Sequence, residues 1–423
     1  MHMQDVTLKN NKHLLFGITV CLVGALFYCY EFLLRILPGT LQGELSIAFG
    51  HISATTFGQL AALYYFAYSP MQLPVGMLID RFGPRRLLSF ACLCCTLGSY
   101  LFMTFSSLWI AGIGRLLVGF GSSFAFVGGL TLMMHWLPRR YFSLATGLMT
   151  TLGMLGLMYG GIKITALTAT LALTQILMIT VIVGAFLTAL IFFVVRDGPG
   201  AKKTQGHALP EFFSQVWRVL ISKEVWLIGL VGAALYTSLS VFGELWGKSY
   251  LESAHGLTSM EAAKSVSAMF LGWAVGAPLG GYFSDKTGRR ALFLVGGAFF
   301  ALLCISAVLY LPHLSYFTLI ALLFLYGVFS GTEIIAFVMA KESSGAELSG
   351  TVFAVINMIV TLGGVIFQPL VGYLLDFNLN KTALTGAVIY TVSDYQRALC
   401  VLPLSLIAVM LIGFFLKDSC RLK

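Results

Sequence analysis

The sequence predicts an all-α membrane protein whose twelve transmembrane helices form two related bundles of six helices. Three observations predict this fold class. The 423 residues are 58% hydrophobic and only 10% charged, with a mean hydropathy of +0.90, whereas a soluble domain carries about 25% charged residues. Apolar stretches recur at the ~20-residue length that a helix needs to cross a bilayer. A short basic motif occurs once in each half of the chain.

The apolar stretches set the order of the elements. We expect helices at residues 14–37, 56–79, 86–105, 108–136, 141–164, 173–195, 226–250, 262–284, 290–310, 315–340, 349–375 and 397–416. The first stretch is too long for a signal-peptide core, so we expect it to be retained. The segment 196–225 is a cytoplasmic linker between a first bundle, 1–195, and a second bundle, 226–423. Within this linker, residues 212–220 are amphipathic, and we expect them on the membrane surface.

Lysine and arginine residues set the orientation, because the cytoplasmic segments of membrane proteins are enriched in them. With the N-terminus inside, most basic residues fall in inward segments and few, such as Lys381, fall outside. The inward set includes Lys202, Lys203, Lys417, Arg421 and Lys423. We therefore expect the chain in a bacterial inner membrane with both termini in the cytoplasm. The net charge of +9 comes from these short clusters, so no nucleic-acid partner is expected.

Chemistry other than transport has little support in the sequence. Cys92, Cys94 and Cys95 lie within a helix without histidine or acidic neighbours, so small apolar filler is a better interpretation than a metal site. The sequence has no nucleotide-binding loop. We therefore expect no enzyme activity, no cofactor and no metal. The expected partners are a small-molecule substrate, protons and the lipid bilayer, and we expect a monomer.

The repeated motif follows the second and the eighth predicted helices. Its members are glycine, aspartate and arginine residues at matched spacing, with Asp285 205 residues after Asp80: Gly76, Asp80, Arg81 and Arg85 in the first copy, and Gly281, Asp285 and Arg289 in the second. This order resembles the signature loop of the major facilitator superfamily, and the resemblance covers nearly the whole chain. It implies transport by alternating access between two repeated halves. It also implies that Asp80 meets the helix near Ser349, and Asp285 the helix near Phe142, when the cytoplasmic side is closed. A loop that only sets topology is the alternative.

Charged residues inside helices need partners, because an unpaired charge in a membrane is costly. Arg115 belongs to a string, Arg115-Leu-Leu-Val-Gly119-Phe-Gly121, that resembles the superfamily's fourth-helix motif. It lies ~10 Å from the outer end of its helix, at 1.5 Å per residue. Glu31 lies at the same depth in helix one. We therefore expect Glu31 to pair with Arg115, either as a fixed ion pair or as a proton-linked switch.

Helices one and seven correspond under the repeat, and each carries an acid and a base four residues apart: Glu31 with Arg35, and Glu244 with Lys248. The spacing of Tyr28, Glu31 and Arg35 keeps them on one helical face, as does that of Glu244 and Lys248. We expect both faces to line the central cavity. Alternatively, Arg35 and Lys248 reach the outer surface and anchor their helix ends.

Helices two, ten and eleven supply further candidates. Glu333 suits a proton carrier if it lacks a counter-charge, but pairing with Asn357 or Lys341 is an equal alternative. Tyr64 and Tyr68 share one face of helix two, and they either line the cavity or pack as an aromatic pair. The candidate proton-coupling residues are Glu31, Arg115, Glu244 and Glu333.

The string Tyr30-Glu31-Phe-Leu-Leu-Arg35 resembles helix one of the superfamily's organophosphate antiporters and anion symporters, which implies that Arg35 binds a substrate anion. Those antiporters use a second arginine in helix seven, where this chain has Ser240. A carboxylate therefore fits better than a phosphate dianion. The strings 244–251 and 368–376 resemble the proteobacterial intraphagosomal amino-acid transporter (Pht) family. That resemblance implies Arg35 for the substrate carboxylate and Glu244 or Glu31 for its ammonium group.

Several functions follow. Proton-coupled uptake of an amino acid or similar small carboxylate-bearing solute is the leading hypothesis. A larger carboxylate, such as a siderophore or short peptide, and efflux of amphipathic compounds are the alternatives, and a sensor that does not transport is a further one. The candidate substrate-binding residues are Tyr28, Glu31, Arg35, Tyr64, Tyr68, Ser240, Glu244 and Asn357.

Overall fold

The computed structural model describes residues 2–105, 107–198, 209–344, 348–377, 390–413, 415, 416 and 418. Every regular element within these ranges is a helix, so the predicted all-helical fold class is confirmed. Part of the linker, 199–208, lies outside the described residues. So do six basic residues that contributed to the predicted orientation: Lys202, Lys203, Lys381, Lys417, Arg421 and Lys423.

The first group of helices agrees with the predicted order, with one interruption. It comprises α1 (His2–Thr40), α2 (Gln42–Ala48), α3 (Ala54–Met71), α4 (Val75–Phe82), α5 (Pro84–Phe102), α6 (Leu108–Trp136), α7 (Arg139–Leu167) and α8 (Leu173–Val194). The span predicted at 56–79 divides into α3 and α4, where Pro70 and Pro74 interrupt the backbone hydrogen bonds. Ser53 begins α3 by accepting a hydrogen bond from the Thr56 amide.

The second group contains two interrupted helices. After α9 (Leu209–Leu220) come α10 (Lys223–Thr237), the π-helical segment η1 (Ser238–Trp246), α11 (Gly247–His255), α12 (Ser259–Thr287), α13 (Arg290–Tyr310), α14 (Tyr316–Ser330), the 3₁₀ turn η2 (Gly331–Glu333), α15 (Ile334–Ser344), α16 (Ser349–Phe377), α17 (Val392–Ala398) and α18 (Val401–Gly413). Glu244 lies in η1 and Glu333 in η2. Such departures from α-helical geometry often mark functional positions.

Ten helical stretches among the described residues are long and apolar enough to cross a membrane, so the chain is a multi-pass membrane protein. The predicted second and third spans, α3 with α4 and α5, are not among these ten. Three tyrosines, a glutamine and other polar residues lower the apolarity of α3, and two charged residues, Arg85 and Arg86, lie near the start of α5. The count of twelve spans and the cytoplasmic position of the termini therefore stay predictions.

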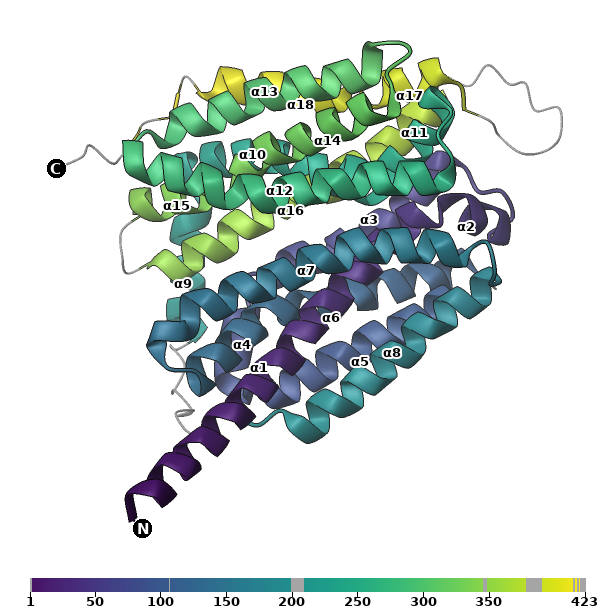
Figure 1. Cartoon of the computed structure of the whole chain (residues 1–423). Helices are drawn as coiled ribbons and strands as arrows, with labels where there is room; N and C mark the ends of the chain where they lie inside the picture. Colours follow the sequence, from purple (N-terminus) through teal and green to yellow (C-terminus); the bar gives the residue numbers. More distant parts are fainter. Residues whose placement is uncertain are drawn as a thin grey trace.

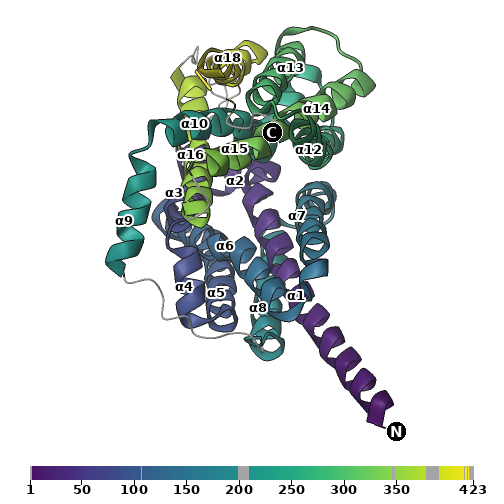
Figure 2. The same cartoon turned by 90° about the vertical axis from the view of Figure 1, so that its left-hand side faces the viewer.

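The helices gather into two groups, α1–α8 and α10–α18 (Figures 1 and 2). Within them α5 packs on α6, α1 on α7, α12 on α14 and α13 on α18. The groups are joined by pairs such as α3 with α16, α7 with α12, and α1 with η1. The linker helix α9 lies beside α10 and α16 (Figure 2). It buries Val216 and Val219 and exposes Phe213 and Trp217, as expected for an amphipathic helix. This arrangement is compatible with two related six-helix halves.

Asp376 joins the two groups at one end of the bundle. We call the end where α1 begins and α18 ends the inner end, and the opposite end, with α2, α11 and α17, the outer end (Figure 1). Asp376 lies at the outer end of α16 and accepts hydrogen bonds from the amides of Ala54 (3.2 Å) and Thr55 (2.7 Å), and from the hydroxyls of Thr55 (2.5 Å) and Tyr390 (2.6 Å). These amides belong to the first turn of α3, where no intrahelical acceptor exists. We call these four residues the outer clasp.

The motif loops at the inner end do not join the two groups in this structure. Asp80 is exposed and makes no hydrogen bond or ion pair with a described residue. Gly76 and Gly281 face open space rather than a neighbouring helix. The sequence predicts that Asp80 and Asp285 contact the opposite group when the inner side is closed. This structure is closed at the outer clasp, so those contacts stay predictions for the other state.

In the second motif the arginine that binds Asp285 is Arg290, the residue after the gating candidate Arg289. Arg290 is buried, forms an ion pair with Asp285 and lies 2.8 Å from a carboxylate oxygen of Glu342 in α15. Arg289 is exposed, and so is Arg81 of the first motif. All these contacts stay within the second group.

Two aspartates at matched positions hold the motif loops to their own groups. Asp197, just after α8, accepts a hydrogen bond from the Arg85 amide at the start of α5 (3.1 Å). Asp418, just after α18, accepts one from the Ala291 amide at the start of α13 (2.8 Å). The Arg85 guanidinium also donates to the Phe192 carbonyl of α8 (2.9 and 3.1 Å). The repeat therefore extends beyond the sequence motif.

Candidate functional site

Arg35 is the centre of a buried network between α1, α3, α10 and η1. Its Nη2 donates to both carboxylate oxygens of Glu31 (3.0 and 3.2 Å), its Nε to the Tyr64 hydroxyl (3.1 Å) and its Nη1 to the Tyr236 hydroxyl (2.9 Å). Arg35 is 5% exposed and Glu31 is 0% exposed. Glu31 and Arg35 therefore share one helical face, as their spacing predicts, and Arg35 is buried and is not a surface anchor.

Glu244 approaches Arg35 from the second helix group. Its Oε1 lies 3.9 Å from Arg35 Nη1, and its Oε2 accepts a hydrogen bond from the Tyr65 hydroxyl. The backbones of α1 and η1 can approach here because Gly39 has no side chain. A Cβ atom at Gly39 would lie 2.1 Å from the Glu244 carbonyl oxygen. The site therefore depends on a glycine that no sequence motif indicated.

Aromatic rings surround the Arg35 guanidinium on its remaining sides. The ring centres of Phe32, Tyr68, Tyr64 and Tyr65 lie 4.4, 5.1, 5.3 and 5.9 Å from its Cζ atom. Cation–π contacts of this kind contribute about 0.5–2 kcal/mol each. Tyr64 and Tyr68 also stack on each other, with ring centres 5.5 Å apart. The rings and the hydrogen bonds together fix the direction of the guanidinium fork.

Arg115 does not pair with Glu31, so the predicted partnership is wrong. Its Nη1 donates to the Leu34 carbonyl (3.1 Å) and its Nη2 to the Ala61 carbonyl (3.5 Å). Its Cζ lies 5.2 Å from the centre of the Tyr64 ring, which also contacts Arg35. Equal depth in the membrane did not bring Glu31 and Arg115 together, because Glu31 meets Arg35 one turn away on its own helix. A proton-coupling role for Arg115 stays a prediction.

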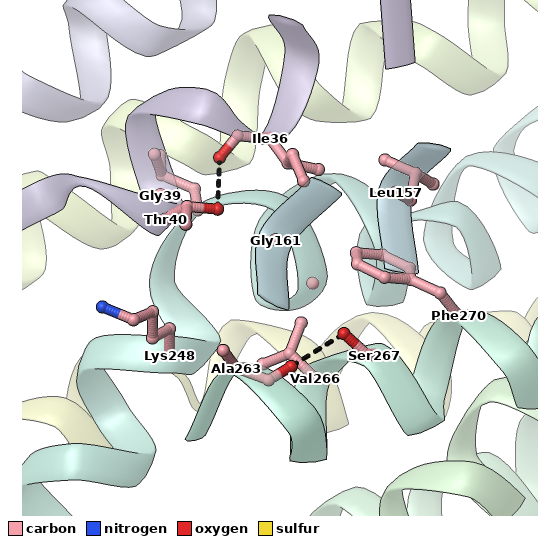
Figure 3. Close-up of a pocket in the computed structure, with 12 residues that line it drawn as sticks. Ile36, Gly39, Thr40, Leu157, Gly161, Lys248, Ala263, Val266, Ser267 and Phe270 are labelled. Carbon is pink, nitrogen blue, oxygen red and sulfur yellow. Dashed lines mark hydrogen bonds between the residues drawn. The ribbon is translucent and has the colours of Figure 1, made fainter. Parts of the chain in front are cut away.

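Lys248 does not pair with Glu244, although both lie on the same predicted face. Its Nζ lies 3.1 Å from a carboxylate oxygen of Glu252. The prediction failed because η1 is π-helical, so α-helical spacing does not hold between Glu244 and Lys248. Lys248 borders a pocket at the outer end with room for about one water molecule. Figure 3 shows Thr40 and Phe270 among its mostly apolar lining, which is unlike a substrate cavity.

Glu333 pairs with neither Asn357 nor Lys341, the two partners that the sequence offered as an alternative to an unpaired carboxyl. It is 3% exposed, and its Oε1 has no hydrogen-bond partner among the described residues. Lys341 is exposed. Asn357 instead donates from Nδ2 to Gln72 Oε1 (2.9 Å), which joins α16 to α3. The proton-carrier role of Glu333 stays a prediction.

Tyr28 and Ser240 occupy supporting positions around the Arg35 network. Tyr28 packs on Phe32, with ring centres 4.7 Å apart. The Ser240 hydroxyl donates to the Tyr236 carbonyl (3.2 Å), and the Ser240 carbonyl accepts from the Gln368 side chain (2.6 Å). Neither residue makes a recorded hydrogen bond to Arg35 among the described residues, but each contacts a residue that touches it.

Tyr65 and Tyr236 belong to the site and were missed from the sequence. Tyr65 is adjacent to Tyr64 and therefore projects from a different side of α3, toward Glu244. Tyr236 lies in α10 and reaches Arg35 across the boundary between the groups. Both residues are tyrosines on apolar helices, and this was the sequence feature that could have indicated them. It does not indicate which helix packs against each tyrosine.

Comparisons with known proteins agree with this architecture. The family model described as "Major Facilitator Superfamily" matches residues 16–368. The crystal structure of the nucleoside transporter NupG superposes with a TM-score of 0.77 over 95% of this chain and 99% of that chain, at 12% identity. At this identity the likeness concerns the fold alone.

Several of the similar curated proteins carry transporter names, and three illustrate them. The "Probable sulfoacetate transporter SauU" of Cupriavidus necator is 22% identical over 292 residues, 66% of each chain. The "Probable galactarate/D-glucarate transporter GarP" of Escherichia coli K12 is 21% identical, covering 77% of this chain and 81% of the relative. The "Lysosomal dipeptide transporter MFSD1" of Danio rerio is 26% identical, covering 67% and 65%. This chain thus spans about two thirds of the first and third relatives. The Pht family, expected from two short strings, is not confirmed. The all-helical fold and a family match over most of the chain lead to one conclusion: this protein belongs to the Major Facilitator Superfamily.

Proposed function

We propose that this protein is a proton-coupled transporter that moves a small carboxylate-bearing solute across a bacterial inner membrane by alternating access, with both termini in the cytoplasm. The observation that carries this proposal is the position of Arg35. Its guanidinium is buried between the two helix groups, and its Nη1 edge faces the second group. Such a fork holds a carboxylate through two parallel hydrogen bonds. Relatives named for sulfoacetate and for galactarate and D-glucarate support an acidic solute.

The carboxylate, more than an amino group, is the feature that this site is suited to recognise. An amino acid needs a carboxylate for its ammonium group as well as Arg35 for its own carboxylate. Glu31 and Glu244 both face Arg35 already. An amino acid would therefore have to draw one of them away from the guanidinium. Amino acids remain one class of the proposed carboxylate substrates.

A short peptide is the second candidate. The amide groups of Gln72 and Asn357 meet between α3 and α16 with an N–O distance of 2.9 Å. Paired amides can exchange their mutual hydrogen bond for bonds to a peptide group of a substrate. The likeness to a transporter named for dipeptides supports this candidate. A site with this many ionised groups gives no support to efflux of amphipathic compounds.

Reconstituted uptake tests the proposal. The purified protein in liposomes is offered radiolabelled D-glucarate, sulfoacetate, L-alanine and L-alanyl-L-alanine, with and without an inward proton gradient. We expect at least one acid to accumulate only with the gradient, and a proton ionophore to abolish accumulation. Liposomes without protein are the control. Binding without any transport would favour a sensor, and gradient-independent accumulation would contradict proton coupling.

A further inference from the structure

The two carboxylates around Arg35 are attached to it in different ways. Glu31 shares α1 with Arg35, lies within hydrogen-bonding distance through both oxygens, and also accepts from Tyr64 (3.0 Å). All three residues belong to the first helix group, so they stay together when the groups move. Glu244 belongs to the second group and lies 3.9 Å from Nη1, beyond a hydrogen bond. Movement of the groups therefore separates Glu244 from Arg35 and leaves Glu31 in place.

The segment that carries Glu244 is suited to change shape. It is the π-helical η1, between the α-helical α10 and α11. π-helical turns are rare and are found frequently at functional sites. The hydroxyl of Tyr236, at the end of α10, occupies the same Nη1 edge of Arg35 at 2.9 Å. A substrate carboxylate that displaces Glu244 from this edge can accept a hydrogen bond from the second N–H of Nη1, whose first N–H is donated to Tyr236, and another from the Tyr236 hydroxyl.

The charges in the site set a condition on that exchange. The titratable groups that face Glu244 are Arg35 and Glu31 from α1, Tyr65 and Tyr68 from α3, Tyr236 from α10 and, farther away, Arg115 from α6. With Glu31 and Glu244 ionised and both arginines charged, the cluster is neutral. An added carboxylate would leave one uncompensated negative charge in a buried site, which is costly. One proton bound at the same time restores neutrality for the one carboxylate that Arg35 holds; the second acid group of a dianion such as D-glucarate or sulfoacetate must lie outside this network.

We propose that the substrate's carboxylate takes the place of Glu244 at the Nη1 edge of Arg35, and that Glu244 receives the proton that moves with it. Glu31 remains the fixed partner that positions Arg35. Protonated Glu244 remains hydrogen-bonded to Tyr65 and no longer competes for the guanidinium. The inference rests on the proposed function and makes it narrower. The substrate is a net anion that enters with one proton. A zwitterion would also need an ionised carboxylate for its ammonium group, but Glu31 stays paired with Arg35 and Glu244 is protonated.

Proton uptake on binding tests this assignment. Detergent-purified protein in weak buffer is mixed with D-glucarate, sulfoacetate, L-alanine or L-alanyl-L-alanine, and binding heat and pH change are recorded together. For the native protein we expect uptake of one proton per bound anion, and a Kd that rises by up to about tenfold per pH unit. Glu244→Gln is expected to bind the same anion within a few-fold, with no proton uptake and no pH dependence. In liposomes it should exchange the anion downhill but not accumulate it.

Two variants make the test specific. Glu31→Gln should weaken binding while each bound anion still takes up one proton, because it removes the group that positions Arg35. Glu252→Gln is the matched control, since this acid pairs with Lys248 outside the network, and it should behave as the native protein. Size-exclusion profiles establish that each variant is folded.

The outcomes separate the inference from the proposed function. Proton uptake that persists in Glu244→Gln overturns the inference while the carboxylate site stands. So does tighter binding of L-alanine than of either anion. If none of the four probes binds the native protein, the proposed carboxylate transport fails, and the inference fails with it.

Discussion

Replacing Asp376 with asparagine should release the outer end of the transporter. The Asp376 carboxylate accepts two backbone amides of α3 and the hydroxyls of Thr55 and Tyr390. Asparagine keeps one acceptor oxygen but turns an amino group toward these donors. It also removes a negative charge from the N-terminus of a helix. Because the clasp joins the two groups only when the outer end is closed, its loss should favour the outward-open state.

The size of this effect follows from the contacts that are lost. Hydrogen bonds to a charged group contribute about 1.5–3 kcal/mol each, against about 1 kcal/mol for neutral pairs. A charge at a helix N-terminus contributes about 0.3–1 kcal/mol more. Since Asp376 is only partly buried, we expect a net loss of about 2–3 kcal/mol. That corresponds to a roughly 30- to 150-fold shift between the two states.

Labelling of a cysteine at the outer end measures the shift. Ala263 is 5% exposed and lines the pocket between α1, α7 and α12, so Ala263→Cys reports opening there. A membrane-impermeant maleimide should label it slowly in the parent and much faster with Asp376→Asn, as quantified by mass spectrometry of that peptide. Asp394→Asn is the matched control, because Asp394 caps α17 within the second group. Equal labelling rates for Asp376→Asn and Asp394→Asn would refute the clasp.

Three further changes have defined outcomes. Asp80→Asn should slow transport with substrate affinity within a few-fold and shift the population toward inward-open; unchanged labelling of an inner-end cysteine would count against it. If Glu333 rather than Glu244 carries the proton, Glu333→Gln should abolish gradient-driven accumulation and preserve downhill exchange, whereas normal accumulation would make this buried carboxyl structural. Gly39→Ala places a methyl group 2.1 Å from the Glu244 carbonyl oxygen. The clash should push α1 and η1 apart at the outer end and so speed labelling of Ala263→Cys; an unchanged rate would mean that η1 shifts without a loss of free energy.

Helix positions could be predicted well from the sequence, because length and apolarity decide them. The predicted bounds 108–136 and 290–310 coincide with α6 and α13. The interruptions at η1 and η2 could not be predicted in this way. Both are local changes of hydrogen-bond register inside continuous apolar runs, and the hydropathy pattern is the same with or without them.

Partners within one helix were predicted better than partners between helices. Glu31 and Arg35 lie one turn apart, so the α-helical period is enough to place them together. Arg115 was assigned a wrong partner on another helix, and Glu333 has neither of its two alternative partners, since depth and charge do not specify which helix faces which. Lys248 was the exception within a helix, because η1 departs from the α-helical period. Tyr65 and Tyr236 meet Glu244 and Arg35 only through the packing of α3 and α10 against the other elements.

Binding of an acid and its amide to Arg35→Lys tests the central claim, that Arg35 holds the substrate's carboxylate. Lysine keeps the charge but cannot form the two parallel hydrogen bonds of the fork. Losing one charged hydrogen bond at about 1.5–3 kcal/mol weakens binding ~10-fold or more. The acid is the best substrate among the four probes, and the amide is the same molecule with that carboxyl amidated. Arg115→Lys, another buried arginine, is the control and should not separate acid from amide. We predict that Arg35→Lys weakens binding of the acid at least ~10-fold and leaves the already weak binding of the amide nearly unchanged. An equal loss for acid and amide would contradict a carboxylate bound at Arg35.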